Sequence, residues 1–438
     1  MHGTELAVGE TRFEVTGITR VEGEGSLRLT VRNGAVTEAH LAIFEAPRYF
    51  EQLVLGRGQD EILDIVARIC GICPIAYQMS AVHAFEDLAG VTIDPAVREL
   101  RRLLYCGEWI ESHALHVYLL HAPDFAGVAS AVELAGLDRP AVERGLSMKK
   151  AGNRLVSILG GRPIHPVSVR VGGFSRVPTV NELRAIRPDL DDALRGALET
   201  VDWVTGFTAP DFERDPLMVS MRHPTDYPMN EGRLVSSDGL DIALRDWPTA
   251  FREEQVPWSH ALQARALDGR AYLLGPSARV TLAREQLHPM ARAALDRSGL
   301  ATAISRNPYW SIAARAIELV HAIATAIEII DAYRRPPRPM EPWTPTPGVA
   351  AWATEAPRGM LFHRYEVDER GRITRAQIVP PTSQNQAAIE ADLTAFAPSV
   401  LHLDHTAATH RLEQLIRSYD PCISCATHFL DLRVEDES

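Results

Sequence analysis

The chain has 438 residues, of which 46% are hydrophobic and 23% charged. This composition is typical of a folded globular protein and excludes a mainly disordered or fibrous chain. The net charge of −12 argues against binding to nucleic acid or to an anionic membrane surface. The longest uncharged run, residues 69–85, is too short and too polar for a membrane span. Because the N-terminal residues also lack the apolar core of a secretory signal, we expect a cytoplasmic protein.

The hydrophobic pattern predicts a mainly α-helical protein with small β regions near both ends. Residues 12–45 alternate apolar and polar side chains around Asn33-Gly34, which predicts a β meander with a hairpin turn. A helical core is expected over about 60–335, and Pro74 suits the first turn of one of its helices. The other long helices are predicted at 94–121, 140–160, 180–207 and 309–334.

Six prolines in residues 336–347 predict an irregular linker. Two strands are expected around Glu369-Arg370-Gly371, followed by helices near 386–396 and 408–418. We expect a C-terminal β and metal-site segment over about 355–428. No domain boundary is visible, so residues 1–438 are predicted to form one domain.

Four of the five cysteines form two C-x-x-C pairs, Cys70/Cys73 and Cys422/Cys425. In a protein expected in the cytoplasm, such pairs indicate metal binding or redox chemistry before a structural disulfide. Two pairs can supply four soft ligands, either to a structural zinc ion or to a catalytic soft metal, and spacing alone leaves both readings open. A thioredoxin-like dithiol fits less well, because no βαβ pattern surrounds either pair. Cys106 stands alone and is predicted to be a buried helix cysteine.

The residues around the pairs, RICGICP at 68–74 and DPCISCATH at 420–428, resemble the two signature motifs of the nickel-iron hydrogenase large subunit. Further segments resemble elements of that family in the same order along the chain. They are RVEG at 20–23, RYFE at 48–51, SHALH at 112–116 with HAPDF at 121–125, GGRPIHP at 160–166, APRG at 356–359 and VPPTSQN at 379–385. The resemblance implies the large-subunit fold with a central bundle of long helices, and reversible heterolytic cleavage of dihydrogen to protons and electrons.

The same resemblance implies the metals and their ligands. All four thiolates would bind nickel, Cys70 and Cys422 as terminal ligands and Cys73 and Cys425 as bridges to iron. Thiolates are soft, electron-rich ligands suited to such a metal pair. The iron would carry carbon monoxide and cyanide ligands, which the residues themselves do not reveal.

Polar groups around the diatomic ligands are the next implication. Thr382, Pro381 and Arg358 fall where the family surrounds its metals, with Arg358 above the side where dihydrogen is split. A buried guanidinium needs an acidic partner, and Asp124 is at the matching position. Without this context, APRG would be an ordinary surface turn and Asp124 an ordinary helix-end residue.

Heterolytic cleavage releases a proton that must leave through an ionisable group. Glu22 is at the family's proton-gate position beside Cys422, and a carboxylate in a partly dry site can be tuned for proton transfer. Glu51 and His428 would bind a second, hard ion, magnesium or iron, near the C-terminus. Taken alone, Glu22 would be a strand-end residue and His428 a capping or core histidine.

Three features depart from many family members. Tyr77 stands where a histidine commonly follows the first cysteine pair, although a tyrosine hydroxyl could still donate a hydrogen bond. Gly23-Glu24 replaces Gly-His, and together with CGICPIAY this resembles the soluble cytoplasmic branch, which passes electrons to nicotinamide cofactors, a deazaflavin or other soluble acceptors. Residues 429–438 would be the tail that a maturation protease removes after nickel insertion.

The metal site would use four cysteines, so the one left cannot bind an iron–sulfur cluster of the usual kind, and no nucleotide motif is present. The resemblance therefore implies an iron-sulfur small subunit and further NAD(P)- or flavin-linked subunits, besides the maturation protease and nickel chaperones. Three alternatives share the residue pattern in part. They are a hydrogen-sensing regulatory subunit with the same metals, a structural four-cysteine zinc protein, and a quinone-site subunit of the respiratory NADH dehydrogenase type, which lacks the four thiolates.

Overall fold

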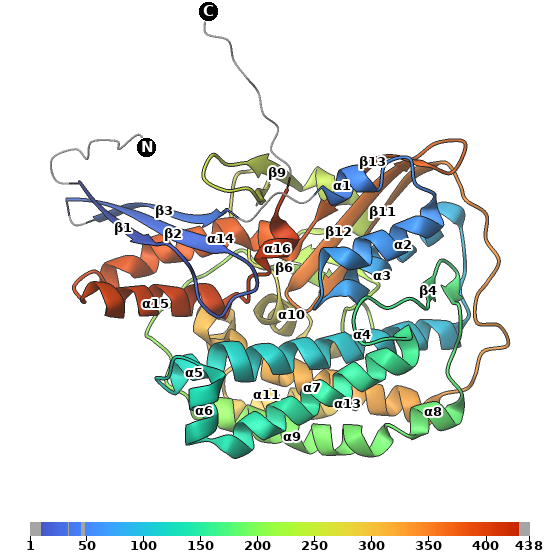
Figure 1. The fold of residues 1–438 in the computed structure, drawn as a ribbon, viewed down its shortest axis with the longest axis horizontal. Coiled ribbons are helices and arrows are strands. Elements are labelled where there is room, and N and C mark those ends of the chain that lie inside the picture. Colours follow the sequence, from blue (N-terminus) through green and yellow to red (C-terminus); the bar gives the residue numbers. More distant parts are fainter. Residues whose placement is uncertain (1–9, 34, 45–48, 429–438) are drawn as a thin grey trace, which may run out of the picture.

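A computed structural model describes residues 10–33, 35–44 and 49–428 of the chain (Figure 1). The predicted N-terminal meander is confirmed as the antiparallel sheet of β1 (Glu10–Val15), β2 (Gly25–Arg32) and β3 (Ala35–Ile43). Asn33 has the left-handed φ of 51° that this hairpin turn requires. The sheet packs on the C-terminal helices α14 (Pro381–Phe396) and α15 (His405–Ser418), so the two ends of the described chain lie together (Figure 1).

The central helix bundle is confirmed. Its long helices pack on one another and form the lower layer in Figure 1: α4 (Pro95–Leu115), α7 (Arg139–Gly160), α9 (Arg187–Thr205) and α13 (Ser311–Ala332). Helices α4 and α7 approach closely at Gly107 and Gly152, where a Cβ on Gly152 would lie 2.8 Å from the Gly107 carbonyl oxygen. The predicted helix over 180–207 is divided into α8 (Val180–Arg184) and α9, which starts afresh with a proline in its first turn.

The middle of the chain contains strands that the sequence did not predict. Strands β6 (Val219–Arg222), β7 (Arg233–Ser236) and β8 (Asp241–Ala243) form one small sheet, and β9 (Phe251–Gln255) pairs with β10 (Leu262–Ala266). The predicted helical core over about 60–335 therefore includes strands that the hydrophobic pattern did not indicate. The reason is that strands of three to five residues are too short to establish a periodicity.

Another three-stranded sheet carries one of the predicted site residues in a turn. Strands β12 (Gly359–Val367) and β13 (Ile373–Val379) are the two predicted strands, and β11 (Gly348–Ala356), which was not predicted, pairs with β12. Ala356 pairs with Gly359, so Pro357 and Arg358 form a tight turn between β11 and β12. Helix α3 (Pro74–Ala89) packs against this sheet and begins at Pro74, as predicted.

The remaining elements are short and connect these layers. They are α1 (Phe50–Leu53), α2 (Gln59–Val66), α5 (Ala122–Phe125), α6 (Ala131–Leu137), α10 (Pro276–Leu282), α11 (Pro289–Ser298), α12 (Ala301–Arg306), α16 (Ile423–Ala426), β4 (Val169–Arg170) and β5 (Gly173–Phe174). Among the described helices, none is both long enough and apolar enough to cross a lipid bilayer. Arg48 and the tail 429–438 lie outside the described residues.

Candidate metal centre

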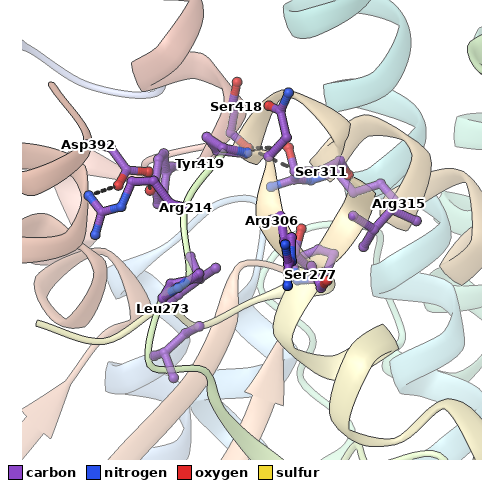
Figure 2. Close-up of a pocket in the computed structure, with 16 residues that line it drawn as sticks. Arg214, Leu273, Ser277, Arg306, Ser311, Arg315, Asp392, Ser418 and Tyr419 are labelled. Atoms are coloured by element: carbon purple, nitrogen blue, oxygen red, sulfur yellow. Dashed lines mark hydrogen bonds and ion pairs between the residues drawn. The ribbon is translucent and has the colours of Figure 1, made fainter. Parts of the chain in front are cut away.

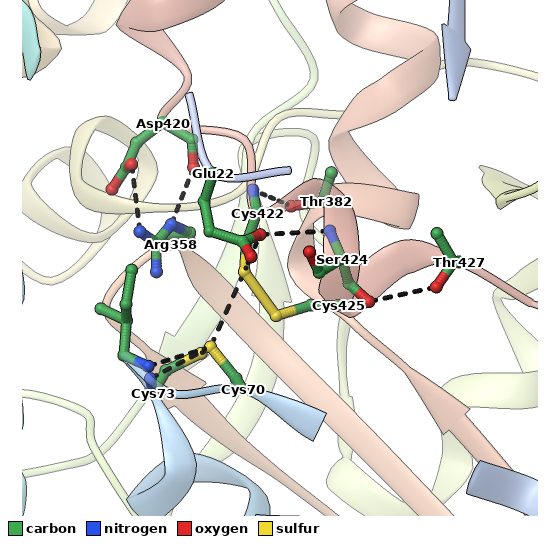
Figure 3. Close-up of a disulfide and its surroundings, with 11 residues drawn as sticks. Glu22, Cys70, Cys73, Arg358, Thr382, Asp420, Cys422, Ser424, Cys425 and Thr427 are labelled. Atoms are coloured by element: carbon green, nitrogen blue, oxygen red, sulfur yellow. Dashed lines mark hydrogen bonds and ion pairs between the residues drawn. A yellow bond between two sulfur atoms is a disulfide. The ribbon is translucent and has the colours of Figure 1, made fainter. Parts of the chain in front are cut away.

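The two cysteine pairs, far apart in sequence, meet in the interior of the protein (Figure 3). Each pair adjoins the start of a helix, since Cys73 precedes α3 and Cys422 precedes α16. All four sulfurs lie within 4.8 Å of one another, and all four residues are buried. Cys70 Sγ lies 2.9 Å from Cys73 Sγ and 3.7 Å from Cys422 Sγ, while Cys422 and Cys425 are joined as a disulfide. When the disulfide is reduced, the cluster offers four soft donors to metal.

The first pair is set up for deprotonation of Cys70. Burial raises the pKa of the Cys70 thiol, but hydrogen bonding from Cys73 and the charge of Arg358 outweigh it, and the pKa is lowered. The backbone N–H groups of Ile72 and Cys73 also donate to Cys70 Sγ, at 3.4 and 3.2 Å. The hydrogen bond to Cys70, together with burial, holds the pKa of Cys73 well above its usual value. The charge of Arg358 and the two backbone N–H groups therefore favour the thiolate form of Cys70.

Glu22 lies beside the second pair, where the resemblance predicts it. Residues Glu22 and Cys422 form a short parallel bridge, and the Ile423 N–H donates to the Glu22 carbonyl oxygen at 2.9 Å. Glu22 Oε2 lies 3.1 Å from Cys422 Sγ and accepts a hydrogen bond from the Ser424 N–H, also at 3.1 Å. The carboxylate is thus held in contact with a cysteine sulfur by the backbone of α16.

Arg358 is buried above the cysteines, but its acidic partner is Asp420, and the expected pairing with Asp124 is wrong. Its Nε donates to the Asp420 carbonyl oxygen at 2.9 Å, and its Nη2 donates to Asp420 Oδ1 at 3.2 Å (Figure 3). Asp420 is the first residue of the second motif and has a left-handed φ of 53°, and both its carbonyl oxygen and its carboxylate accept from Arg358. The DPCISC spacing was the available signal for this residue. Arg358 Nη1 is buried and has no hydrogen-bond partner among the described residues.

Asp124 instead forms ion pairs with the two segments that lead into the site. Arg417 donates to its carboxylate from Nε at 2.8 Å and Nη2 at 2.9 Å, and Arg20 makes a further short ion pair with it. Arg20 and Arg417 lie just before Glu22 and Cys422 in sequence. Burial alone would raise the pKa of Asp124, but these arginines outweigh it and lower that pKa. Asp124 therefore acts on the site through its neighbours.

Replacing Asp124 with asparagine is expected to destabilise the protein at neutral pH by about 3 kcal/mol, because two arginines lose a buried charge partner. The lowered pKa fixes the sign of the pH dependence. The stabilisation is present above the ordinary aspartate pKa of about 4 and is lost as the pH falls through the lower, folded-state pKa. Thermal unfolding of both proteins between neutral and acidic pH measures this. If the difference in stability between the wild type and Asp124→Asn stayed constant down to the lowest pH at which both fold, this expectation would be contradicted.

Thr382 and Pro381 open helix α14 next to the second pair. The Thr382 hydroxyl accepts a hydrogen bond from the Cys422 N–H at 2.9 Å and still carries one hydrogen to donate. Pro381 occupies the first turn of α14, where a missing N–H costs nothing. The structure thus brings Thr382 into contact with the cysteine segment, as expected.

Glu51 and His428 also meet, at a second site. His428 Nε2 lies 2.8 Å from Glu51 Oε2, and Glu51 Oε1 accepts a hydrogen bond from the Ile378 N–H at 2.7 Å. Glu253 on β9 adjoins this pair and was missed by sequence reasoning, because it belongs to no motif. Burial raises the pKa of Glu253 to about 7, and the nearby Glu51 adds to the rise. Carboxylate oxygens of this kind are the ligands that a hard cation prefers.

The three histidines of SHALH and HAPDF are buried, and each approaches a neighbouring segment through its Nε2. His113 Nε2 lies 2.9 Å from Glu318, and His116 Nε2 lies 2.8 Å from the Arg417 carbonyl oxygen. His121 Nε2 lies 3.3 Å from Ser418 Oγ. A π-helical turn over His116–His121 follows α4, and the rings of His116 and His121 are tilted at 59° with centroids 5.1 Å apart.

A small pocket is lined in part by Ser418 and Tyr419, the two residues that precede Asp420 (Figure 2). Arg315, Ser311 and Ser418 contribute to its lining. Arg315 Nη2 lies 3.9 Å from Asp420 Oδ2, so Asp420 stands between two buried arginines, Arg315 and Arg358. Elsewhere, Tyr77 is fully buried with its ring 5.7 Å from that of His363, and Cys106 is buried in α4 as predicted.

Comparisons with known proteins agree with this geometry. The family model described as nickel-dependent hydrogenase matches residues 48–138 and 252–428. Sulfhydrogenase 1 subunit alpha of Pyrococcus furiosus is 31% identical over 95% of this chain and 97% of its own length. The NAD-reducing hydrogenase HoxS subunit beta of Cupriavidus necator is 26% identical over 96% of this chain and 95% of its own.

Solved structures give the same result for the fold. A crystal structure of an NAD⁺-reducing [NiFe]-hydrogenase in the H₂-reduced state covers 95% of this chain and 99% of its own, with 25% identity and a TM-score of 0.86. The nickel-iron-selenium hydrogenase of D. vulgaris Hildenborough, at 21% identity and a TM-score of 0.76, shares the fold. The chain belongs to the nickel-dependent hydrogenase family. It is a large, catalytic subunit, and its activity is that of a hydrogenase.

Proposed function

We propose that this chain splits dihydrogen reversibly at a nickel-iron centre held by Cys70, Cys73, Cys422 and Cys425. The convergence of four buried sulfurs within 4.8 Å carries the proposal, because soft thiolates are the donor set that such metals require. Cys73 and Cys425 would bridge the two metals, and Cys70 and Cys422 would bind nickel alone. When bound, the metals supply the redox-active Lewis acid that polarises dihydrogen.

The surroundings also fit an iron that carries carbon monoxide and cyanide. Cyanide is a hydrogen-bond acceptor, so a buried site for it needs donors. The buried Arg358 Nη1 and the remaining hydrogen of the Thr382 hydroxyl offer such donors beside the cysteines, and Pro381 contributes an apolar wall. Arg358 and the four cysteines are all buried, so the centre is shielded by the protein.

Glu22 is the residue we assign to proton transfer. Its Oε2 lies 3.1 Å from Cys422 Sγ and can accept a proton that leaves the metal centre on that side. The Ser424 N–H holds the same oxygen in place and limits its movement during the transfer. Asp124 and Asp420 contribute by fixing the segments that bear Glu22, Cys422 and Arg358.

The single experiment that tests this function is metal analysis with infrared spectroscopy on the complex, matured together with its partners and accessory factors. Nickel and iron with bands of metal-bound carbon monoxide and cyanide are expected, with steady hydrogen turnover. Zinc alone, without such bands, would identify a structural four-cysteine site. The same metals and bands with negligible turnover would identify a hydrogen sensor.

Glu51 and His428 are proposed to bind a second ion, magnesium or iron, that fastens the C-terminal segment to β13. Replacing Glu51 with glutamine is expected to remove this ion and to weaken C-terminal attachment, with nickel and iron retained. Elemental analysis and thermal unfolding measure both effects, and Glu369→Gln, on an exposed turn, is the matched control. A variant with full second-ion content would refute the assignment.

An iron-sulfur small subunit is the partner that we propose for electron transfer. The cysteine loop reaches the surface at Gly71, beside a hollow that Ile72, Lys149 and Arg154 help to line. A cluster docked there would face the metals across the CGIC loop. We further propose NAD(P)- or flavin-linked subunits and a cytoplasmic location, because the relatives include an NAD-reducing enzyme.

Maturation is proposed to involve nickel chaperones and a protease that removes residues 429–438. Because the β1–β3 sheet packs on the C-terminal helices, we also propose that residues 1–438 form one domain. Comparing the mass of the matured chain with that of the chain produced without nickel tests the cleavage.

A further inference from the structure

A second buried arginine lies beneath the turn that carries Arg358. Arg279, on α10, is fully buried. Its Nη1 donates to the Ala356 carbonyl oxygen and its Nη2 to the Pro357 carbonyl oxygen, both at 2.9 Å. These carbonyls belong to the two residues that directly precede Arg358, so Arg279 binds the backbone of the β11–β12 turn.

The other donors of Arg279 anchor it to two carboxylates. Nε and Nη2 donate to Glu318 at 2.7 and 2.8 Å, and Nη1 donates to Glu355 at 2.9 Å. All five N–H groups of the guanidinium are thereby used. Glu318 lies on the long helix α13 and also accepts a hydrogen bond from the Tyr227 hydroxyl at 2.7 Å. The turn is therefore connected through Arg279 to the helix bundle.

The residue just before α10 also approaches the turn closely. Gly275, just before α10, has a φ of 103°, and a Cβ there would lie 2.8 Å from the Arg358 carbonyl oxygen. The backbone of the turn is thus held from the side of α10, while the Arg358 guanidinium is held separately by Asp420. A lysine could not replace Arg279, because one ammonium group cannot span two carbonyls and two carboxylates.

We propose that Arg279 is a positioning residue, which fixes the β11–β12 turn so that the Arg358 guanidinium stays above the four cysteines. The inference rests on the proposed function for the role of Arg358, but the clamp on the turn can be measured without it. Loss of Arg279 should therefore loosen the turn, and it should lower the rate of hydrogen oxidation only by displacing Arg358.

The test compares Arg279→Lys with Arg101→Lys in the matured complex. Arg101 is an equally buried arginine that binds Glu86 with two hydrogen bonds of 2.6 Å and is held by α4, away from the turn. Hydrogen–deuterium exchange of a peptide covering 355–360 should rise about tenfold in Arg279→Lys, because hydrogen bonds that fix the turn are lost. It should stay unchanged in Arg101→Lys. Unchanged exchange in Arg279→Lys would overturn the clamp, whether or not the complex oxidises hydrogen.

Turnover supplies the second readout. Arg279→Lys should lower hydrogen oxidation about 100-fold with nickel and iron content retained, because a displaced active-site group is costly. When Arg358 has already been replaced with lysine, Arg279→Lys should lower hydrogen oxidation no further. A second loss of the same size in that double variant would overturn the proposal. A wild-type complex without turnover would instead refute the proposed function and leave the exchange result standing.

If Arg279→Lys does not fold, the same exchange measurement is made on Glu355→Gln, with Glu86→Gln as its control. Glu355→Gln keeps the shape of the clamp and weakens one of its anchors, so exchange over 355–360 should rise about threefold. Glu86→Gln weakens the partner of Arg101 and should leave that peptide unchanged. Equal exchange in both variants would overturn the proposal.

Discussion

Replacing Cys425 with serine is expected to remove nickel and iron from the matured complex and to lower hydrogen oxidation by at least about 10³-fold. A serine hydroxyl is a hard, weakly acidic ligand and cannot replace the thiolate that would bridge the two proposed metals. Cys425 is one of the four sulfurs that lie within 4.8 Å of one another, so no other described sulfur can take its place. Elemental analysis, infrared bands and turnover of the same preparation give the result.

Cys106→Ser is the matched control for this change. Cys106 is fully buried in α4, and burial raises the pKa of its thiol to about 12, so it is not prepared for metal binding. The control should keep its nickel, iron and turnover. Full metal content in Cys425→Ser, or loss of metal from Cys106→Ser alone, would show that the cysteine cluster is not the metal site.

Replacing Glu22 with glutamine is expected to lower hydrogen turnover by about 10²–10⁴-fold, because the amide cannot accept and release a proton. The amide has the shape of the carboxylate and can still accept the hydrogen bond from the Ser424 N–H. Nickel and iron content and the infrared bands should therefore remain those of the wild type. This separation of metal content from turnover distinguishes proton transfer from a structural role.

Glu24→Gln is the control for Glu22, since Glu24 is two residues away on the exposed surface. It should retain wild-type turnover. If Glu22→Gln turned over hydrogen at the wild-type rate, protons would leave by another route. If Glu22→Gln lost nickel, the carboxylate would be needed to assemble the site, and the assignment to proton transfer would fail.

The sequence alone identified the four cysteines that form the candidate metal centre of this protein. Two C-x-x-C pairs with their flanking residues define the donor set, and Pro74 sets the start of the helix that follows the first pair. The long helices were predictable because their apolar periodicity extends over many turns, as in α13. The positions of Glu22, Glu51 and His428 followed from ordered motifs, and the structure brings each to the partner expected for it.

Only the tertiary structure decided which charged groups face each other. Asp124 and Asp420 are both aspartates in motifs, yet Asp420 binds Arg358 and Asp124 binds Arg417 and Arg20. Glu253 and Arg279 belong to no motif, and packing alone carries them to the Glu51–His428 pair and to the β11–β12 turn. The physical reason is that the sequence specifies ligand types and local periodicity, whereas the pairing of buried charges depends on contacts between segments that are distant in the chain.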